Sequence, residues 1–141
     1  MNASPDQLPE KPRPISSPEN QVWWQALIEH RLLAQCCSNC KKKRLYPRPM
    51  CEKCYSLEFD WVELSGDGTV HSWTVAHHAF NPAFKRELPY VTVTVDLGED
   101  LRLHAPLRDA NHNDLAIGMS VCVGFDDIDD TYSTLFFRPK A

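Results

Sequence analysis

Two Cys-x-x-Cys pairs constrain the fold of this 141-residue chain more than any other feature. The pairs are Cys37 with Cys40 and Cys51 with Cys54, and residues 41–50 separate them. Each short loop turns its two thiolates to one side, so two facing loops supply four thiolates to one tetrahedral ion. Because closed four-sulfur coordination leaves no position for water, we predict a structural Zn²⁺ on these four cysteines.

Six cysteines in a short chain would also suit a secreted disulfide scaffold. The first residues lack the apolar core of a signal peptide, and no apolar run approaches the roughly 18 residues that a membrane-spanning helix needs. We therefore expect a cytoplasmic protein that does not enter a membrane and uses its cysteines for metal. Cys36 stays outside the metal set, because only Cys37 gives the two-residue spacing. The spacing leaves zinc and iron open, since four thiolates also hold a single iron ion.

The first half of the chain divides into three regions of different composition. Residues 1–17 hold four prolines among polar residues, which predicts a flexible N-terminal arm. Ser17-Pro18-Glu19 has the form of a helix start, and apolar residues follow at helical spacing. We predict a helix region over residues 18–34 that begins near Pro18. The cysteine-rich residues 35–58 then form the predicted zinc ribbon.

The second half of the chain, residues 59–141, has the pattern of short β-strands. Apolar and polar residues alternate in short runs, and turn residues such as Gly66-Asp67-Gly68 separate the runs. Five or six strands with one long irregular connection fit a small closed Greek-key barrel, for which the OB-fold is the usual form. The predicted fold is mainly β with an N-terminal helix: a rubredoxin-like zinc ribbon followed by a five-stranded OB-fold barrel.

A cluster of cations surrounds the predicted metal site. Four thiolates and one Zn²⁺ sum to a charge of about −2, so charge compensation explains the cations without any ligand. The alternative is a phosphate-bearing ligand such as acyl-CoA, with Lys43, Arg44 and Arg48 as candidate contacts. Nucleic acid is disfavoured, because the formal net charge is −4. The cluster consists of Lys41, Lys42, Lys43, Arg44, Arg48 and Lys53.

A long loop follows His77 and His78, at the end of a predicted strand, and carries Phe80 and Phe84. Loops of this length usually serve binding. We therefore add the two histidines to the candidate contacts for acyl-CoA or phosphate. No nucleophile and base stand at an evident triad spacing, so the sequence predicts no catalytic residue.

The predicted helix is apolar over about two-thirds of its circumference, which is wide for a lone helix on a small domain. One interpretation is that Trp23 and Trp24 pack on the core of their own domain. The other is that part of the helix docks on another subunit, because aromatic side chains dominate many interfaces. The candidate partner contacts are then Trp23, Trp24, Phe80 and Phe84.

Seven sequence blocks between about Pro18 and Pro139 resemble one known family, in the family's order. It is the family once known as domain of unknown function thirty-five, now described as zinc-ribbon and OB-fold proteins associated with acyl-CoA enzymes. The blocks are Gln35–Cys40, Tyr46–Cys51, Trp61–Val70, Ser72–Val75, Leu88–Val91, Ile117–Val121 and Phe137–Pro139.

The resemblance implies a non-catalytic accessory subunit of a thiolase-like acyl-CoA enzyme, which helps to form the CoA and acyl channel and stabilises its partner. The loop from His77 to Phe84 and the segment Glu87–Tyr90 most resemble the aldolase partners. We therefore favour retro-aldol cleavage of a β-hydroxyacyl-CoA from a steroid or bile-acid side chain. The implied partner is a thiolase-like or lipid-transfer-type protein, in a heterotetramer with acyl-CoA at the shared interface. An acyl-condensing complex and a free-standing nucleic-acid-binding OB module are the alternatives.

Overall fold

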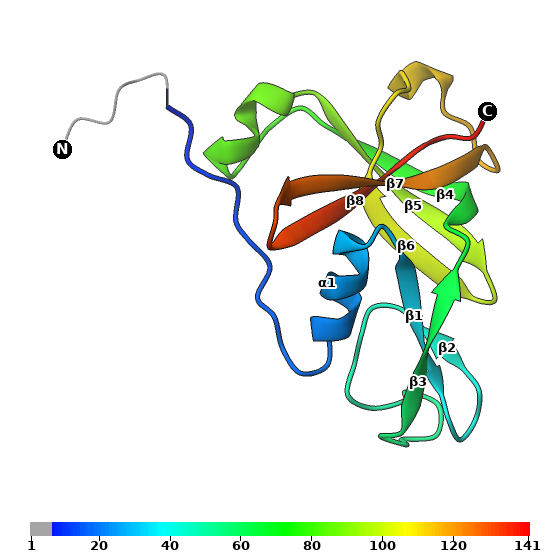
Figure 1. Cartoon of the computed structure of the whole chain (residues 1–141). Coiled ribbons are helices and arrows are strands. Elements are labelled where there is room, and N and C mark those ends of the chain that lie inside the picture. Colours follow the sequence, from blue (N-terminus) through cyan, green and yellow to red (C-terminus); the bar gives the residue numbers. More distant parts are fainter. Residues whose placement is uncertain (1–6) are drawn as a thin grey trace.

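The computed structural model describes residues 7–141 and divides into a small ribbon and a larger sheet domain (Figure 1). Residues 1–6 of the predicted arm lie outside the described residues. No helix within residues 7–141 has the length and apolar character needed to cross a lipid bilayer. The elements are α1 (Gln21–Ile28), β1 (Leu32–Cys37), β2 (Lys43–Arg44), β3 (Phe59–Leu64), β4 (Asp67–Ala76), the 3-10 helix η1 (Pro82–Glu87), β5 (Tyr90–Gly98), β6 (Leu101–Pro106), the 3-10 helix η2 (His112–Asp114), β7 (Ser120–Asp129) and β8 (Tyr132–Pro139).

The smaller sheet has the order β2-β1-β3 and contains a strand that the sequence analysis assigns to the barrel. β3 pairs antiparallel with β1 along its whole length, from Leu32 opposite Leu64 to Cys37 opposite Phe59. The first residues of β1 in turn lie inside the region predicted to be helical. Alternation identifies a strand but not its partner, so the sequence did not reveal this pairing.

α1 begins at Gln21, later than the predicted start near Pro18. The carbonyl oxygen of Ser17 accepts hydrogen bonds from the N–H groups of Asn20 (3.1 Å) and Gln21 (2.9 Å), so the chain turns before the helix. The Asn20 side chain accepts from the Ser17 N–H (2.7 Å) instead of capping the helix. Ser17, the predicted first residue of the helix, therefore belongs to the turn that precedes α1.

The larger sheet has the order β6-β5-β4-β7-β8, and it is curved but not closed by a continuous ladder. Its edges meet after β6, at one parallel bridge between Leu107 and Phe137. The N–H of Arg108 also donates to the carbonyl oxygen of Phe137 (2.8 Å). The predicted five strands are thus present, and the predicted closed barrel is corrected to the partly open form that OB-folds adopt.

The core fills the inside of this curved sheet and is covered by α1. Period-2 alternation buries one face of each strand, as the burial patterns of β5 and β6 show. Trp23, Ala26 and Leu27 supply the buried face of α1 at helical spacing. Phe137 of β8 is the largest fully buried side chain in the described residues.

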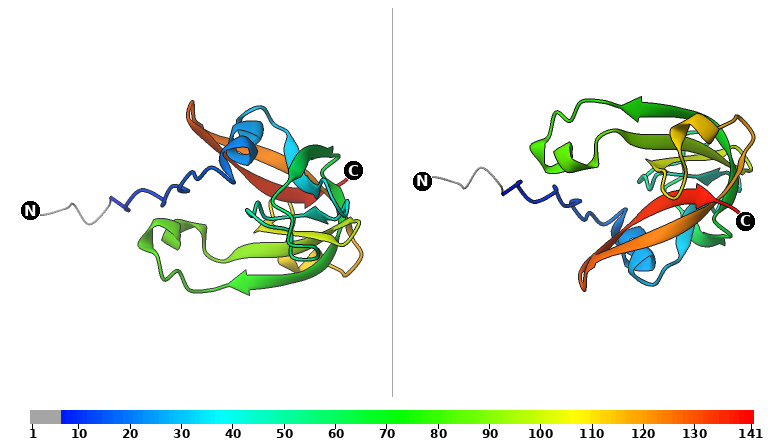
Figure 2. Two further views of the ribbon diagram at one scale, coloured as in Figure 1. Left: turned by 90° about the horizontal axis from the view of Figure 1, so that it is seen from below. Right: turned by 90° about the horizontal axis from the view of Figure 1, so that it is seen from above.

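Residues 7–17 form neither helix nor strand, and they run between two hairpins that project in the same direction (Figure 2). One hairpin consists of β7 and β8, and the other consists of β4 and β5 with η1 at its end. Lys11 forms an ion pair with Glu87, and Arg13 forms one with Asp129 (2.5 Å). The flexibility of the arm remains a prediction.

Two phenylalanines test this assignment of core and surface. Phe137 has no exposed area and Phe80 is 94% exposed, although both belong to the larger sheet domain. Replacing Phe137 with Ala should lower the free energy of unfolding by about 3–5 kcal/mol, because it removes a buried aromatic ring and leaves a cavity. Phe80→Ala is the matched control and should change it by less than about 0.5 kcal/mol. Equal effects in denaturant unfolding would contradict the assignment.

Candidate metal centre

The four predicted cysteine ligands lie on two turns of the same shape. Cys37 ends β1, and its carbonyl oxygen accepts from the N–H of Lys41 (2.9 Å). In the second turn, the carbonyl oxygen of Cys51 accepts from the N–H of Tyr55 (2.9 Å). Lys41 and Tyr55 have φ of 63° and 62°, so both turns close through a left-handed residue just after the second cysteine. The two turns therefore present their sulfurs in the same way.

The four sulfur atoms fit around a single ion. All lie within 4.8 Å of one another, with 3.5 Å between the sulfurs of Cys37 and Cys54 and 3.6 Å between those of Cys40 and Cys51. A tetrahedron with metal–sulfur bonds of about 2.3 Å has edges of about 3.8 Å, whereas a disulfide bond measures about 2.05 Å. The structure thus brings the four predicted ligands together at metal-site spacing, with Cys37 and Cys51 fully buried.

Hydrogen bonds change the pKa of some of these thiols and so the ease with which they become thiolates. The Asn39 side chain and the N–H of Ser56 lower the pKa of Cys54 to about 6. At Cys40, the Lys42 N–H favours the thiolate, but burial and the neighbouring sulfurs outweigh it and raise the pKa to about 11. Crowded thiols hold their protons because several adjacent negative charges repel one another. A divalent cation removes that repulsion, so metal binding and loss of these protons are coupled.

Arg44, a predicted phosphate contact, is buried inside the ribbon and 3% exposed. Its Nε donates to the side-chain oxygen of Gln35 (2.7 Å), and one Nη donates to the carbonyl oxygen of Arg48 (3.1 Å). The guanidinium also lies over the ring of Phe59, 5.2 Å from its centroid. A solvent-borne phosphate cannot reach this group, so the prediction for Arg44 is corrected to a structural role.

The other cations of the cluster lie at the surface of the ribbon and are largely paired with carboxylates. Lys43 pairs with Glu99 (2.6 Å), and Glu52 pairs with both Lys42 (2.6 Å) and Arg48 (2.8 Å). These pairs support charge compensation as the reason for the cluster. A cleft of about 490 Å³ lies beside the metal site and is lined by Cys40, Lys41, Lys42, Lys43, Lys53, Glu99 and Asp100.

The predicted ligand residues on the long loop lie far from the ribbon. The η1 segment is at the opposite end of the molecule from β2 and β3 (Figure 1). His77, His78 and Phe80 are exposed there, with the His78 and Phe80 rings in edge contact at 4.7 Å. Phe84 is half-buried, and the ammonium of Lys11 lies 5.2 Å from its ring centroid. The predicted cations and histidines therefore do not form one site.

The two tryptophans of α1 have different surroundings. Trp23 is 6% exposed, and its indole N–H donates to the carbonyl oxygen of Leu33 (3.1 Å). The structure thus places Trp23 in the core instead of at an interface, as the first of the two interpretations expects. Trp24 is half-buried, with Tyr132 of β8 beside it at 6.4 Å.

Two important contacts had no clear signal in the sequence. Gln35 is fully buried, and its side-chain oxygen accepts from both Arg44 and the N–H of Arg48 (2.9 Å). The Tyr46 hydroxyl accepts from the N–H of His104 (3.0 Å) and donates to the carbonyl oxygen of the same residue (3.3 Å). Gln35 and Arg44 thus order the ribbon loop, and Tyr46 attaches that loop to the edge strand β6.

A hydrogen-bonded chain of Ser133, Asp127 and His30 contains the residue types of a catalytic triad in a different order. The Ser133 hydroxyl donates to Asp127 (2.6 Å), and His30 Nε2 lies 2.9 Å from the same carboxylate oxygen. In a triad the histidine lies between the nucleophile and the carboxylate, whereas here the carboxylate is central. The Ser133 hydroxyl and His30 lower the pKa of Asp127. These hydrogen bonds join the end of α1 to the β7–β8 hairpin.

Comparison with known proteins identifies the family. Family models for the ChsH2 rubredoxin-like zinc ribbon domain and the ChsH2 C-terminal OB-fold domain match residues 24–60 and 61–126. A DUF35 domain-containing scaffold protein of Methanocaldococcus jannaschii is 32% identical over 123 residues, which cover 83% of this chain and 86% of that protein. The chain belongs to the DUF35 family.

Two further relatives extend the comparison. A solved structure described as the Ltp2-ChsH2(DUF35) aldolase contains a chain with 38% sequence identity and a TM-score of 0.81, covering 90% of this chain and 98% of that one. A probable enoyl-CoA hydratase alpha subunit of Thermomonospora curvata is 39% identical over 129 residues, which are 92% of this chain. This DUF35 chain spans only 40% of the length of that hydratase subunit.

The metal site is tested by a pair of cysteine variants. Cys40→Ser should reduce the metal content from about one ion per chain to near zero after mild chelation, and should lower the melting temperature, because a structural metal contributes directly to folding. Cys36→Ser is the matched control, since Cys36 lies next to the site but outside the cluster. Elemental analysis that finds equal metal in both variants would contradict the assignment.

The structural role of Arg44 predicts a loss of stability that requires no ligand. Arg44→Met removes two hydrogen bonds of a charged group and should lower the free energy of unfolding by about 2 kcal/mol. Arg48→Met changes an exposed arginine of the same ribbon and should cost less than about 1 kcal/mol. If the two variants unfold alike in the absence of ligand, Arg44 is not the structural residue described here.

Proposed function

We propose that this DUF35 chain is a non-catalytic partner subunit of an enzyme that acts on acyl-CoA thioesters. The observation that carries the proposal is the likeness to the chain of the Ltp2-ChsH2(DUF35) aldolase, which extends over 98% of that chain at 38% identity. The M. jannaschii relative, described as a scaffold protein, supports an organising role. This chain and the aldolase chain are similar in fold and sequence along most of their length, so the likeness is not confined to one motif.

We propose Zn²⁺ as the ion held by Cys37, Cys40, Cys51 and Cys54. The match to a zinc ribbon model and the sulfur spacing support this choice, and elemental analysis distinguishes zinc from iron. When bound, the ion would fix the two turns together. Closed four-sulfur coordination offers no position for substrate or water, which supports a structural role.

For the reaction of the complex we favour retro-aldol cleavage of a steroid or bile-acid side-chain β-hydroxyacyl-CoA. In that reaction a base removes the β-hydroxyl proton, the Cα–Cβ bond breaks to give a carbonyl compound, and the acyl-CoA enolate is protonated at Cα. A thiolase-like or lipid-transfer-type partner would supply these steps, in a heterotetramer. The second candidate is a subunit of an enoyl-CoA hydratase, which the T. curvata relative favours. An acyl-condensing complex would use the same surfaces.

The η1 loop, residues 77–89, is the proposed contact with the partner. Phe80 of this loop is 94% exposed, and burying a phenylalanine side chain contributes about 1.5–3 kcal/mol. His77 and His78 lie beside it and would contact the partner or the acyl-CoA. Phe84 lies behind them under Lys11, so it would support the loop more than contact the partner directly. An exposed aromatic side chain of this kind is typical of an interface anchor.

A phosphate of acyl-CoA could also reach the ribbon. Lys43 and Arg48 would have to exchange Glu99 and Glu52 for the phosphate. Because exposed ion pairs contribute about 0–1 kcal/mol, such an exchange is energetically accessible.

All six cysteines are free of disulfide bonds, which supports the expected cytoplasmic location.

Co-purification tests the proposed function. Full-length chain should co-purify with a co-expressed thiolase-like protein from its own organism, and Phe80→Ala should weaken that complex about tenfold or more, because the anchor is lost. Ile117→Ala is the matched control, since Ile117 is an exposed apolar residue (78%) outside the η1 loop. No complex with any thiolase-like protein would contradict the function. A complex unaffected by Phe80→Ala would contradict only the proposed surface.

A further inference from the structure

We propose that α1 and the β7–β8 hairpin form a recognition groove for an extended proline-rich segment that carries an arginine. The chain's own Lys11–Ser16 segment occupies this groove, which we call the arm groove. It is formed by Trp24 of α1 and by Asp129, Thr131 and Tyr132 of the hairpin. The inference does not depend on the proposed function, because it rests on contacts within this chain.

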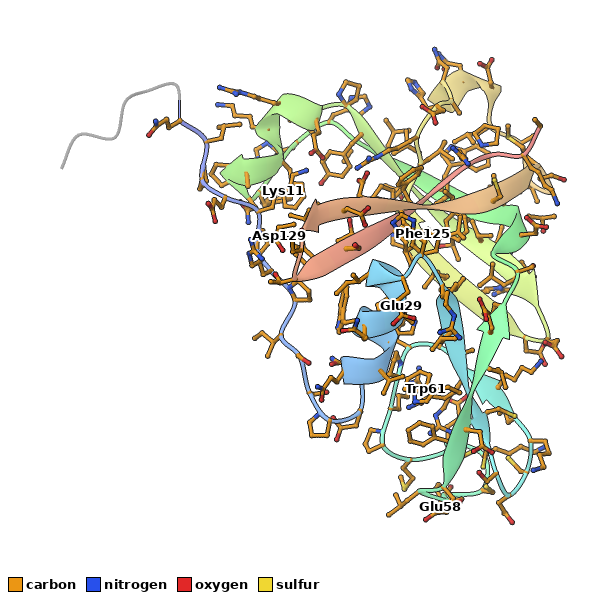
Figure 3. All side chains as sticks on the ribbon, in the orientation of Figure 1. Lys11, Glu29, Glu58, Trp61, Phe125 and Asp129 are labelled. Atoms are coloured by element: carbon orange, nitrogen blue, oxygen red, sulfur yellow. The ribbon has the colours of Figure 1, made fainter. Side chains whose placement is uncertain are left out.

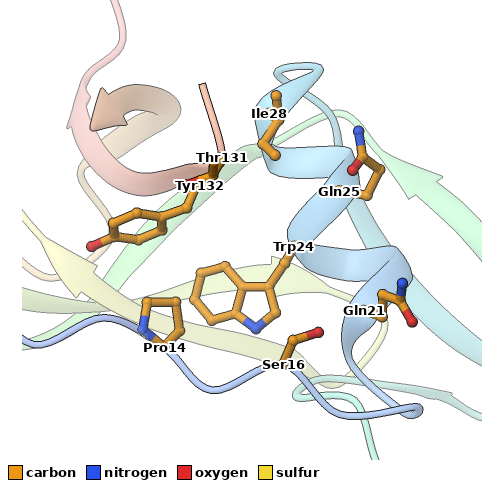
Figure 4. A pocket seen from close by; sticks show the side chains of 8 residues that line it. All are labelled: Pro14, Ser16, Gln21, Trp24, Gln25, Ile28, Thr131 and Tyr132. Atoms are coloured by element: carbon orange, nitrogen blue, oxygen red, sulfur yellow. The ribbon is translucent and has the colours of Figure 1, made fainter. Parts of the chain in front are cut away.

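The first contact is between a proline and two aromatic rings. Pro14 lies beside the rings of Trp24 and Tyr132, which are 6.4 Å apart at an angle of 66° (Figure 4). Trp24 is itself held by an edge contact with the buried Trp23, at 4.8 Å. Proteins that recognise proline-rich segments use such aromatic-lined grooves, because a proline ring presents a rigid apolar face. The rings are therefore positioned to recognise the shape of a proline.

The second contact is a three-part site for one guanidinium group. One Arg13 Nη lies 2.5 Å from an oxygen of Asp129, and the other donates to the hydroxyl of Thr131 (3.3 Å). The guanidinium carbon also lies 5.4 Å from the centroid of the Tyr132 ring. Arginine can satisfy a carboxylate, a hydroxyl and a ring face at once, whereas lysine is a compact point charge. The site therefore favours arginine next to the proline.

The third contact anchors the other end of the segment across the gap between the hairpins. Lys11 pairs with Glu87, and its ammonium lies over the ring of Phe84. Figure 3 labels Lys11 on the arm and Asp129 on the β7–β8 hairpin. Two basic residues of the arm thus meet two acidic residues on different hairpins. The intervening Pro12 restricts the backbone, which reduces the entropy lost when the segment is ordered. Charge and shape of the segment both match the groove.

Part of the arm groove remains open beside the arm. A cleft of about 160 Å³ lies along Gln21, Trp24, Gln25 and Ile28, while Ile15 of the arm is 88% exposed. The arm thus makes its contacts in the groove through Pro14 and the two basic residues, and the exposed Ile15 adds little. Such a segment is displaceable by a second Pro-Arg-Pro segment. Its advantage is the effective concentration of a tethered ligand, on the order of millimolar for a short linker.

A peptide competition experiment tests the inference on the full-length chain. The probe is a synthetic peptide of residues 7–17, and calorimetry measures its binding to the wild-type chain and to the Arg13→Ala/Pro14→Ala double variant. The double variant has a weakened arm, so it should bind the peptide at least tenfold more tightly than the wild-type chain does. A peptide with Arg13→Glu should bind neither protein, because it places a carboxylate against Asp129.

A groove substitution completes the test. Asp129→Asn, added to the double variant, should weaken peptide binding about tenfold, and it lies on an exposed hairpin position that the fold tolerates. Trp24→Ala should have the same effect if the variant remains folded. No peptide binding to the double variant, or equal binding to the double variant and the wild-type chain, overturns the inference.

Discussion

The convergence of four sulfur atoms on one point determines how the rest of this small protein is organised. The ribbon has a two-residue strand, and its apolar side chains at Leu33, Leu45 and Trp61 belong to the core shared with the larger sheet. A metal ion held by the four cysteines would join the two turns directly, and β1 connects that site to the core of the larger sheet. Gln35 and Arg44 extend the ordered region to the loop that carries Tyr46. The metal centre therefore supports the ribbon, and Tyr46 fixes the ribbon to the larger sheet.

Much of this organisation could be predicted from the sequence, because spacing and alternation report local geometry. The ligand set followed from the two cysteine pairs, and the β-rich second half followed from period-2 patterns. The partners of a strand depend on distant residues, so the pairing of Phe59–Leu64 with β1 could not be predicted. Burial of charge has no sequence signature either. Arg44 belongs to a basic run whose other members are solvated, and only the structure distinguishes it.

The surface of the described residues contains regions with different chemistry. The ribbon presents lysines and an arginine largely paired with acids, whereas the η1 loop presents the exposed Phe80 and two histidines. The arm groove lies between α1 and the β7–β8 hairpin. Because these regions lie on different parts of the chain, they could contact different components at the same time. That property agrees with the organising role proposed for it.

The division of labour between this chain and a thiolase-like partner is tested most directly by turnover of a branched β-hydroxyacyl-CoA. The rate is measured for each purified chain and for their equimolar mixture. We predict that this chain alone releases no carbonyl product, and that the mixture releases the carbonyl compound together with the shortened acyl-CoA. Steady turnover by this chain alone, retained in the absence of any partner protein, would contradict a non-catalytic role.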